Sequence, residues 1–215
     1  MKADAATSPR GAGVRRDQRD ATRARLLEGA VSVLIEHGVA GTTTLAVQER
    51  CDVGRGTLLH HFPTHADLLS STVTELAHRN EAFVEAEADR LSAVTDPLER
   101  AIRVMANVAS QPSYLAELEL WAVSRTDERL RAALRTSEHG ARRDHDRVLA
   151  DLFGDIADQP GGTTVINLSI EFSRGLALSG ILRRDPVKRE RLLCEWVAAA
   201  KVLVTSTLKQ GAEQC

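Results

Sequence analysis

A short segment in the first third of the chain brings together residue types that bind base edges and phosphates of DNA. Arg55 can donate two hydrogen bonds to guanine O6 and N7, and Thr57 can bond a base or a phosphate, while Gly56 lets the backbone approach closely. His60 and His61 follow one turn later, where imidazoles can donate to phosphates. This combination at the start of a short helix predicts a recognition helix in the major groove.

Such a helix needs a partner helix that braces it across the DNA backbone. Residues 44–51 form a second short helical pattern, and a turn at 52–54 joins the two. Pro63 ends the recognition helix, expected at about 55–62. Two apolar residues of this helix, Leu58 and Phe62, are expected in the core. The alternative is that 43–62 is a core helical hairpin with no role in DNA binding.

The same stretch carries a family resemblance. The residues from Thr43 to Phe62, TTLAVQERCDVGRGTLLHHF, and the PTHADLL that follows resemble helices two and three and the start of helix four of the TetR (tetracycline-repressor) family. The resemblance covers roughly residues 20–70. It implies a homodimeric repressor that a small molecule releases from its operator. The expected DNA contacts are Thr43, Thr44, Arg55, Gly56, Thr57, His60, His61 and His65, with Arg15, Arg16 and Arg19 at phosphates or in the minor groove.

Five positions depart from the family pattern. Asp52 replaces a usual glycine, and Asp is among the few other residues that tolerate positive φ. Gly54 replaces a serine and caps the recognition helix more weakly. Leu59 and His65 replace a tyrosine and a lysine that contact phosphates, and Gln48 stands where a small residue usually packs. These changes predict a weaker grip on the backbone within an intact fold, and the Arg-rich N-terminal segment can restore the lost charge.

The charge of the chain is unevenly distributed. The formal net charge is −2, but residues 1–65 hold nine Lys/Arg and seven Asp/Glu, against 19 and 23 in the remainder. Residues 1–19 lack periodicity and are expected to be a flexible basic arm. Three widely spaced cysteines form neither a CxxC pair nor a disulfide framework, which indicates a reducing cytoplasm. No signal peptide or membrane segment is expected.

The remaining chain predicts helices of ordinary globular length. Before the helix-turn-helix, the first helix of the chain is expected at about 21–37, with Gly38 at its end. Proline, glycine and aspartate punctuation divides the later chain into helices at about 65–90, 97–110, 113–125, 127–153, 163–183 and 187–209. The prediction is an all-α protein of about nine helices. Its parts are a basic arm (1–19), a three-helix helix-turn-helix domain (20–65), and a helical domain for effector binding and dimerisation (66–215).

The last two helices carry the expected dimer interface. Ser169, Ser173 and Ala177 form a stripe of small residues on one face of 163–183, which lets another helix approach closely. Trp196, Ala200 and Leu203 lie on a wide apolar face of 187–209. Two such helices from each protomer predict a four-helix bundle. The alternative is that both faces pack against helices of the same chain.

The effector is expected among the middle helices. Helix 113–125 is apolar nearly all round but carries Glu117 and Glu119, about 200° apart on the helical wheel. Glu119 has aliphatic neighbours, which makes it the candidate polar group of a pocket that binds a small organic effector. The expected pocket residues are Phe83, Met105, Leu118, Glu119 and Trp121. The alternative is that an internal Arg103 or Arg174 already pairs with Glu119.

No nucleophile elbow, phosphate loop or metal-ligand spacing is found in the sequence. No catalytic residue, cofactor or metal is therefore expected, and the protein is interpreted as a DNA-binding regulator with three partners: duplex operator DNA, a second copy of itself and a small effector. Two other classes remain open. One is a helical enzyme, and the other is a helical ligand carrier whose DNA-binding head is weakened.

Overall fold

The structure, a computed structural model, describes the backbone of residues 9–212 and the side chains of 16–137 and 146–205. Every regular element in the described part of the chain is helical, which confirms the predicted all-α class. The nine α-helices and one short 3₁₀ turn are α1 (Pro9–Gly41), α2 (Thr44–Cys51), α3 (Arg55–His61), α4 (His65–Arg90), α5 (Pro97–Ala109), α6 (Pro112–Ser124), α7 (Glu128–Phe153), η1 (Gly154–Ile156), α8 (Gly162–Leu182) and α9 (Pro186–Ala212).

The first three helices enclose a small core of their own. Leu26, Ala30 and Val33 of α1 pack with Val47 of α2 and Leu58 of α3. Phe62, directly after α3, belongs to the same cluster, so both apolar residues of the recognition segment are buried as predicted. Since α2 and α3 are short, this shared core, rather than helix propensity, holds them in place.

A second core joins these three helices to the rest of the molecule. Val31, Leu34 and Val39 of α1 pack with apolar residues of α4, α6 and α7, including Leu76 and Leu120. Since α4 also contributes Leu68 to the core of the first three helices, it connects the two parts of the molecule along its length. A displacement of α4 or α6 would therefore act directly on the first three helices.

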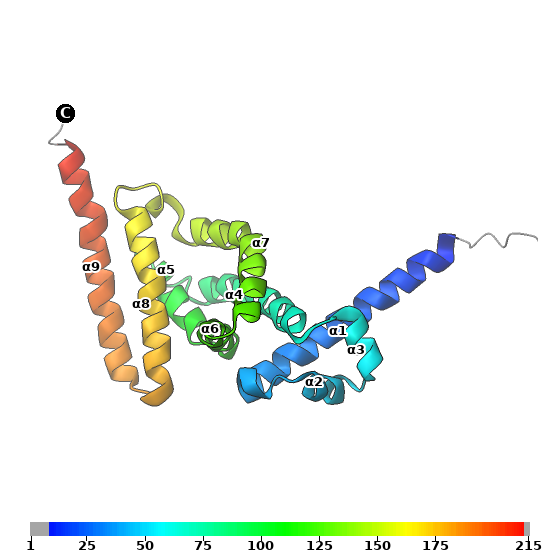
Figure 1. Cartoon of the computed structure of the whole chain (residues 1–215). Helices are drawn as coiled ribbons and strands as arrows, with labels where there is room; N and C mark the ends of the chain where they lie inside the picture. Colours follow the sequence, from blue (N-terminus) through cyan, green and yellow to red (C-terminus); the bar gives the residue numbers. More distant parts are fainter. Residues whose placement is uncertain (1–8, 213–215) are drawn as a thin grey trace, which may run out of the picture.

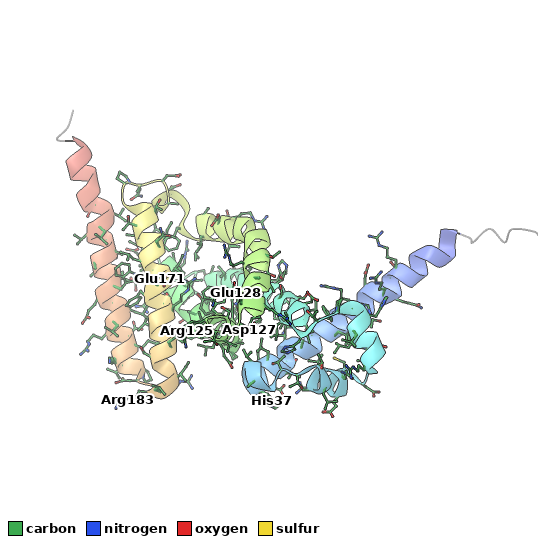
Figure 2. All side chains as sticks on the ribbon, viewed as in Figure 1. His37, Arg125, Asp127, Glu128, Glu171 and Arg183 are labelled. Carbon is green, nitrogen blue, oxygen red and sulfur yellow. The ribbon has the colours of Figure 1, made fainter. Side chains whose placement is uncertain are left out.

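The third core lies in the body, between α5, α7, α8 and α9. It contains Ala101 and Ile102 of α5, Val165 of α8, and Leu193 and Val197 of α9. Figure 1 shows α8 and α9 side by side at one end of the molecule, with α2 and α3 at the other. Figure 2 shows Arg183 at the turn between α8 and α9 and His37 near the end of α1.

The start of α1 differs from the sequence-based expectation, whereas the interruption at Gly38 agrees with it. α1 begins at Pro9 rather than near Ala21, so residues 9–19 continue the helix instead of forming an irregular arm. Arg and Ala are good helix formers, and a helix that is already held by its packed part gains one backbone hydrogen bond for each residue added. Gly38 has φ 69° and ψ −177°, which interrupts α1 where the sequence predicts its end.

One helix has unusual hydropathy. By length and composition alone, α8 is long and apolar enough to cross a membrane. No membrane segment is expected from the amino-acid sequence. Core helices of soluble proteins pass the same test, and one face of α8 is buried against the chain's own core. The remaining apolar residues of α8, such as Leu168 and Leu182, are exposed in the single chain.

Candidate functional site

Local hydrogen bonds fix the two short helices. The Thr43 hydroxyl caps α2 by accepting a 3.0 Å bond from the Ala46 amide. Asp52 takes the left-handed conformation (φ 49°, ψ 57°) that ends α2, in agreement with the tolerance expected of aspartate. A side chain at Gly29 would overlap Sγ of Cys51, so this glycine allows α1 and α2 to approach closely. Burial raises the pKa of the Cys51 thiol, which fits a packing role.

The outer face of α3 is free of protein contacts that would cover it. Arg55, Gly56, Thr57 and His60 are exposed, whereas Leu58 between them is buried. Gly54 caps α3 through extended backbone without a side-chain hydrogen bond, as its substitution for serine predicts. The exposed residues are the ones expected to contact DNA, so the helix is rotated with its polar face outward.

Several of the other expected DNA contacts are held within the chain. The imidazole Nε2 of His65 donates a 2.6 Å bond to the Thr42 carbonyl, which fixes the start of α4 to the end of α1. His61 is half-buried, and burial and then the neighbouring His60 lower its pKa below the usual value of a histidine, which favours the neutral imidazole. Thr43 and Thr44 lie at the start of α2, where Thr43 acts as a cap. The capping role of Thr43 is the one that its place before residues 44–51 predicts, whereas the bond of His65 to Thr42 depends on how α1 meets α4 and could not be found from the sequence.

The basic N-terminal half of α1 supplies further positive charge. Arg16 and Arg19 are exposed on this half, which extends past α3 in Figure 1. The side chain of Arg15 lies outside the described residues. Arg23 instead makes contacts within the chain. Its guanidinium lies 5.2 Å from the Phe62 ring centroid and donates to the Ser71 hydroxyl.

A cavity of about 300 Å³ lies among the body helices. Its apolar walls include Val84, Met105, Val108, Leu149 and Ile170. The polar groups at its wall are Asn80, Glu81, Tyr114, Glu117, Trp121, Asp146, Ser173 and Arg174. A mostly apolar cavity with a few polar groups is what small-molecule sites usually present.

A chain of hydrogen bonds orders one side of this cavity. The Ser113 hydroxyl donates to Asn80 Oδ1 (2.6 Å), and Asn80 Nδ2 donates to Glu117 Oε2 (3.0 Å). On the other side Arg174 donates to the Tyr114 hydroxyl (3.1 Å). Burial raises the pKa of Tyr114, so its hydroxyl stays protonated at neutral pH.

The expected effector residues do not gather in one place. Met105 and Trp121 line the cavity just described, but Leu118 and Glu119 line a second cavity of about 490 Å³ between α1, α6 and α8. Phe83 lines neither of the two. The prediction that Glu119 is the polar group beside Trp121 is therefore corrected, and Glu117 occupies that place.

Glu119 instead reaches the DNA-binding part of the chain. Its Oε1 accepts a 2.8 Å hydrogen bond from the backbone amide of Val39, immediately after the interrupted end of α1. Neither of the expected arginine partners is used here, because Arg103 pairs with Glu99 and Glu190, and Arg174 pairs with Glu171. A Cβ at Gly38 would lie 2.8 Å from Glu119 Oε1 and would displace this carboxylate, and the positive φ disfavours any side chain at this position.

The expected dimer stripe is also used inside the chain. Ser169, Ser173 and Ala177 are only 0%, 2% and 6% exposed, since this face of α8 packs against the protein's own core. Trp196 donates from Nε1 to the Ser169 hydroxyl (2.9 Å), and Ala200 is buried. The prediction that these residues form the dimer contact is corrected, and of the six only Leu203 is exposed.

A different face of the last two helices is apolar and uncovered. Leu168, Leu178 and Leu182 of α8 and Val187 and Val202 of α9 are all exposed, and Leu178 lies at the edge of this face, where it also borders the second cavity. Gly175 lies between the first two and has open space beyond its Cα. This exposed α8–α9 face is rotated away from the stripe that the sequence indicates.

Known proteins with similar sequences share the helix-turn-helix region. Residues 26–72 match the family model described as bacterial regulatory proteins, tetR family. An uncharacterized HTH-type transcriptional regulator of Mycobacterium tuberculosis is 29% identical over 124 residues, which is 57% of this chain and 63% of that protein. The chain thus matches less than two thirds of the length of this relative. The HTH-type transcriptional regulator CymR of Pseudomonas putida is 26% identical over 80% of this chain and 85% of its own length.

Solved structures share the fold over most of the chain. A member of the TetR family from Streptomyces coelicolor has a TM-score of 0.57 and 20% identity, covering 83% of this chain and 97% of its own. The multidrug binding protein EbrR complexed with ethidium has a TM-score of 0.60 and 20% identity, covering 83% and 98%. The helix-turn-helix match, the long alignment with CymR and the shared fold agree with one another. Residues 26–72 therefore carry the helix-turn-helix of the tetR family of bacterial regulatory proteins, and the chain as a whole shares the fold of a solved member of that family.

Proposed function

We propose that the protein is a cytoplasmic, homodimeric transcriptional repressor that binds a palindromic DNA operator and is released from it by a small organic effector. The exposed polar face of α3, braced by α2, is the observation that carries the proposal. Arg55 and Thr57 are free to enter a major groove at the N-terminal end of α3, where recognition helices contact bases. Arg16 and Arg19 add phosphate contacts from α1.

A second copy of the chain is the proposed occupant of the exposed α8–α9 face. Leu168, Leu178 and Val202 would be buried by a pair of helices from the partner, and Gly175 would let the partner's helix approach closely. A two-fold axis through this face places the two α3 helices on the same side of the dimer. The dimer then matches the symmetry of a palindromic operator.

The cavity lined by Trp121 and Glu117 is the proposed effector site, and α6 is the proposed link to the DNA-binding part. Glu117 faces the cavity, whereas Glu119 of the same helix bonds to Val39 at the end of α1. A ligand that shifts α6 would therefore change the position of α1. To release the operator tenfold, the ligand must prefer the non-binding conformation by about 1.4 kcal/mol.

The names of similar proteins support this reading. CymR and the mycobacterial relative are named HTH-type transcriptional regulators, and EbrR is named a multidrug binding protein in complexes with imidazole, proflavin and ethidium. A regulator of this kind acts on DNA and needs no catalytic residue. Its place of action would be the cytoplasm, where its thiols stay reduced.

The test is a gel shift with DNA from the promoter region of the protein's own gene, comparing wild type with Arg55→Ala. A wild-type complex that resists non-specific competitor DNA and weakens in the variant is expected. Compounds would then be screened for release of that complex. No specific complex would favour a ligand carrier with a weakened DNA-binding head and would contradict the proposal.

A further inference from the structure

We infer that the body cavity binds an uncharged, mostly apolar molecule that presents a hydrogen-bond-accepting oxygen to Trp121 and Ser173, and that it rejects organic acids. This inference rests on the proposed effector site and names the chemical class of its ligand. Two buried polar atoms, the charge of the wall and the size of the cavity support it.

The first observation concerns two polar atoms without partners. The indole Nε1 of Trp121 and the hydroxyl of Ser173 are buried, and neither has a hydrogen-bond partner among the residues that the structure describes. Both residues line the cavity, and Ser173 is 2% exposed. A buried donor without a partner costs free energy, which a ligand that accepts its hydrogen bond recovers.

The chemistry of these two atoms selects the ligand's polar group. An indole N–H only donates, so its partner must be an acceptor. A serine hydroxyl can donate to an acceptor as well. A carbonyl, ether or hydroxyl oxygen satisfies both requirements, whereas a purely hydrocarbon ligand leaves the Trp121 donor unpaired.

The charge of the wall opposes a carboxylate in that role. The described lining residues include three acidic side chains, Glu81, Glu117 and Asp146, and one basic side chain, Arg174. The Arg174 guanidinium already pairs with Glu171 (2.6 Å) and lies over the Trp121 ring at 4.9 Å. A carboxylate would therefore lose its hydration in this cavity without meeting an unpaired cation among the described lining residues.

The cavity's size and walls define the rest of the molecule. A volume of about 300 Å³ is at the lower end of the range for ligand sites, which suits a molecule of one or two rings. Met105, Val108 and Ile170 offer apolar contact on several sides. An apolar body of this size gains from burial without a second polar group.

Three naphthalenes substituted at the same ring position test this class by calorimetry on the full chain without DNA. Acetylnaphthalene carries a neutral acceptor, ethylnaphthalene has the same size without one, and naphthoate carries a negative charge. Acetylnaphthalene should bind about five- to tenfold more tightly than ethylnaphthalene, the gain expected from a hydrogen bond. Naphthoate should bind more weakly than either.

Matched variants locate the effect. Trp121→Phe and Ser173→Ala should each remove most of the preference for acetylnaphthalene over ethylnaphthalene, and this ratio of the two affinities is the quantity compared among the variants. Trp196→Phe and Ser169→Ala are the controls, because they remove the other indole N–H and its serine partner on α8. Both controls should keep the preference. Thermal unfolding would verify that each variant folds.

Three results would overturn the inference: naphthoate binding as tightly as acetylnaphthalene, a preference unchanged in Trp121→Phe and Ser173→Ala, or no binding of acetylnaphthalene. The proposed function fails separately, through the gel shift. If the three naphthalenes bind in the expected order but no specific operator complex forms, the ligand class is supported and the regulatory role is contradicted. If organic acids alone release the protein from its operator, the regulatory role is supported and the proposed ligand class is contradicted.

Discussion

The backbone amide of Val39 donates a 2.8 Å hydrogen bond to Oε1 of Glu119, so the end of α1 is fixed to α6 by one side chain. On the same helix Glu117 lines the body cavity. α6 thus contacts the proposed effector on one face and the DNA-binding part on another. This arrangement explains how a small displacement at the cavity can reach α1 without a change inside the helix-turn-helix itself.

Replacing Glu119 should separate its role as a link from any role in ligand binding. Glu119→Leu leaves the Val39 amide without its acceptor and should lower the free energy of unfolding by about 1–3 kcal/mol in denaturant titrations. Glu119→Gln keeps a carbonyl oxygen that can accept the same bond, so it should lose less. A compound that releases wild type from the operator should release Glu119→Leu less effectively while binding it equally well. If both variants had the same free energy of unfolding as wild type, the bond from Val39 to Glu119 would contribute nothing to stability.

The two groups of arginines should respond differently to mutation. Arg55→Ala should weaken operator binding by about 1–3 kcal/mol and relax specificity at one base pair per half-site, because the variant cannot form the bidentate hydrogen bonds to guanine. Arg16→Ala and Arg19→Ala should weaken binding to all sequences. Each should reduce the slope of log affinity against log salt by about 0.9 for every phosphate that the variant no longer neutralises.

Fluorescence anisotropy at several salt concentrations measures both effects. Arg125→Ala is a suitable control, because Arg125 lies in the body, away from α3 (Figure 2). If Arg55→Ala changed only the salt slope and kept the sequence preference, α3 would not be the element that reads bases.

The exposed α8–α9 face should be the dimer contact. Leu178, 49% exposed in the single chain, would be buried by the partner, so Leu178→Arg should give folded monomers by light scattering. Leu45→Arg is the control, because Leu45 is exposed on α2, far from this face, and its variant should remain a dimer. Ala177→Arg should unfold the protein instead, since Ala177 is buried within its own chain. A dimeric Leu178→Arg would place the interface elsewhere.

Acid should destabilise the protein in part through Glu87. Hydrogen bonds from Arg90 and then Asn107 hold the pKa of this buried carboxyl below 4.5, against the opposing effect of burial. Because the folded pKa is lowered, the stabilisation is fully present above pH 4.5 and is lost as the pH falls through the folded value. Glu87→Gln should therefore lower Tm at pH 7 by about 2–6 °C and show a smaller further loss in acid.

Thermal unfolding between pH 7 and pH 3 checks this behaviour. Glu75→Gln is the matched control, since Glu75 pairs with Arg79 on the same helix but at a half-exposed position. Its effect at pH 7 should be within about 1 kcal/mol, as for exposed pairs. An acid dependence of Glu87→Gln equal to that of wild type would assign the acid sensitivity to other carboxyls.

The helices could be predicted from the sequence because their ends are set locally. α4 begins and ends where the sequence predicts, since Thr64 and Asp67 form a capping box at its start. The recognition face of α3 could also be predicted, because Leu58 and Phe62 have to be buried and this fixes the rotation of the helix. Polar residues such as Arg55 then have to face outward.

The functional faces of the body could not be predicted in the same way. On α8, the Ser169–Ala177 stripe and the exposed face with Leu178 are both suited to helix packing, and only the position of α5 and α9 decides which one is already covered. On α6, Glu117 and Glu119 both have apolar neighbours in sequence. Their roles are set by the elements opposite them, the cavity for Glu117 and the end of α1 for Glu119. Tertiary packing, which a single helix does not encode, distinguishes them.

Selection of binding sites from a pool of random duplexes tests the central claim most directly. A dimer that presents two α3 helices should enrich a palindrome whose half-sites lie about 10 base pairs apart from centre to centre, or a multiple of that spacing. The same selection with Arg55→Ala should lose one guanine preference in each half-site. If wild-type protein enriched no sequence and bound every duplex with the same salt-sensitive affinity, the account of this chain as an operator-binding repressor would be contradicted.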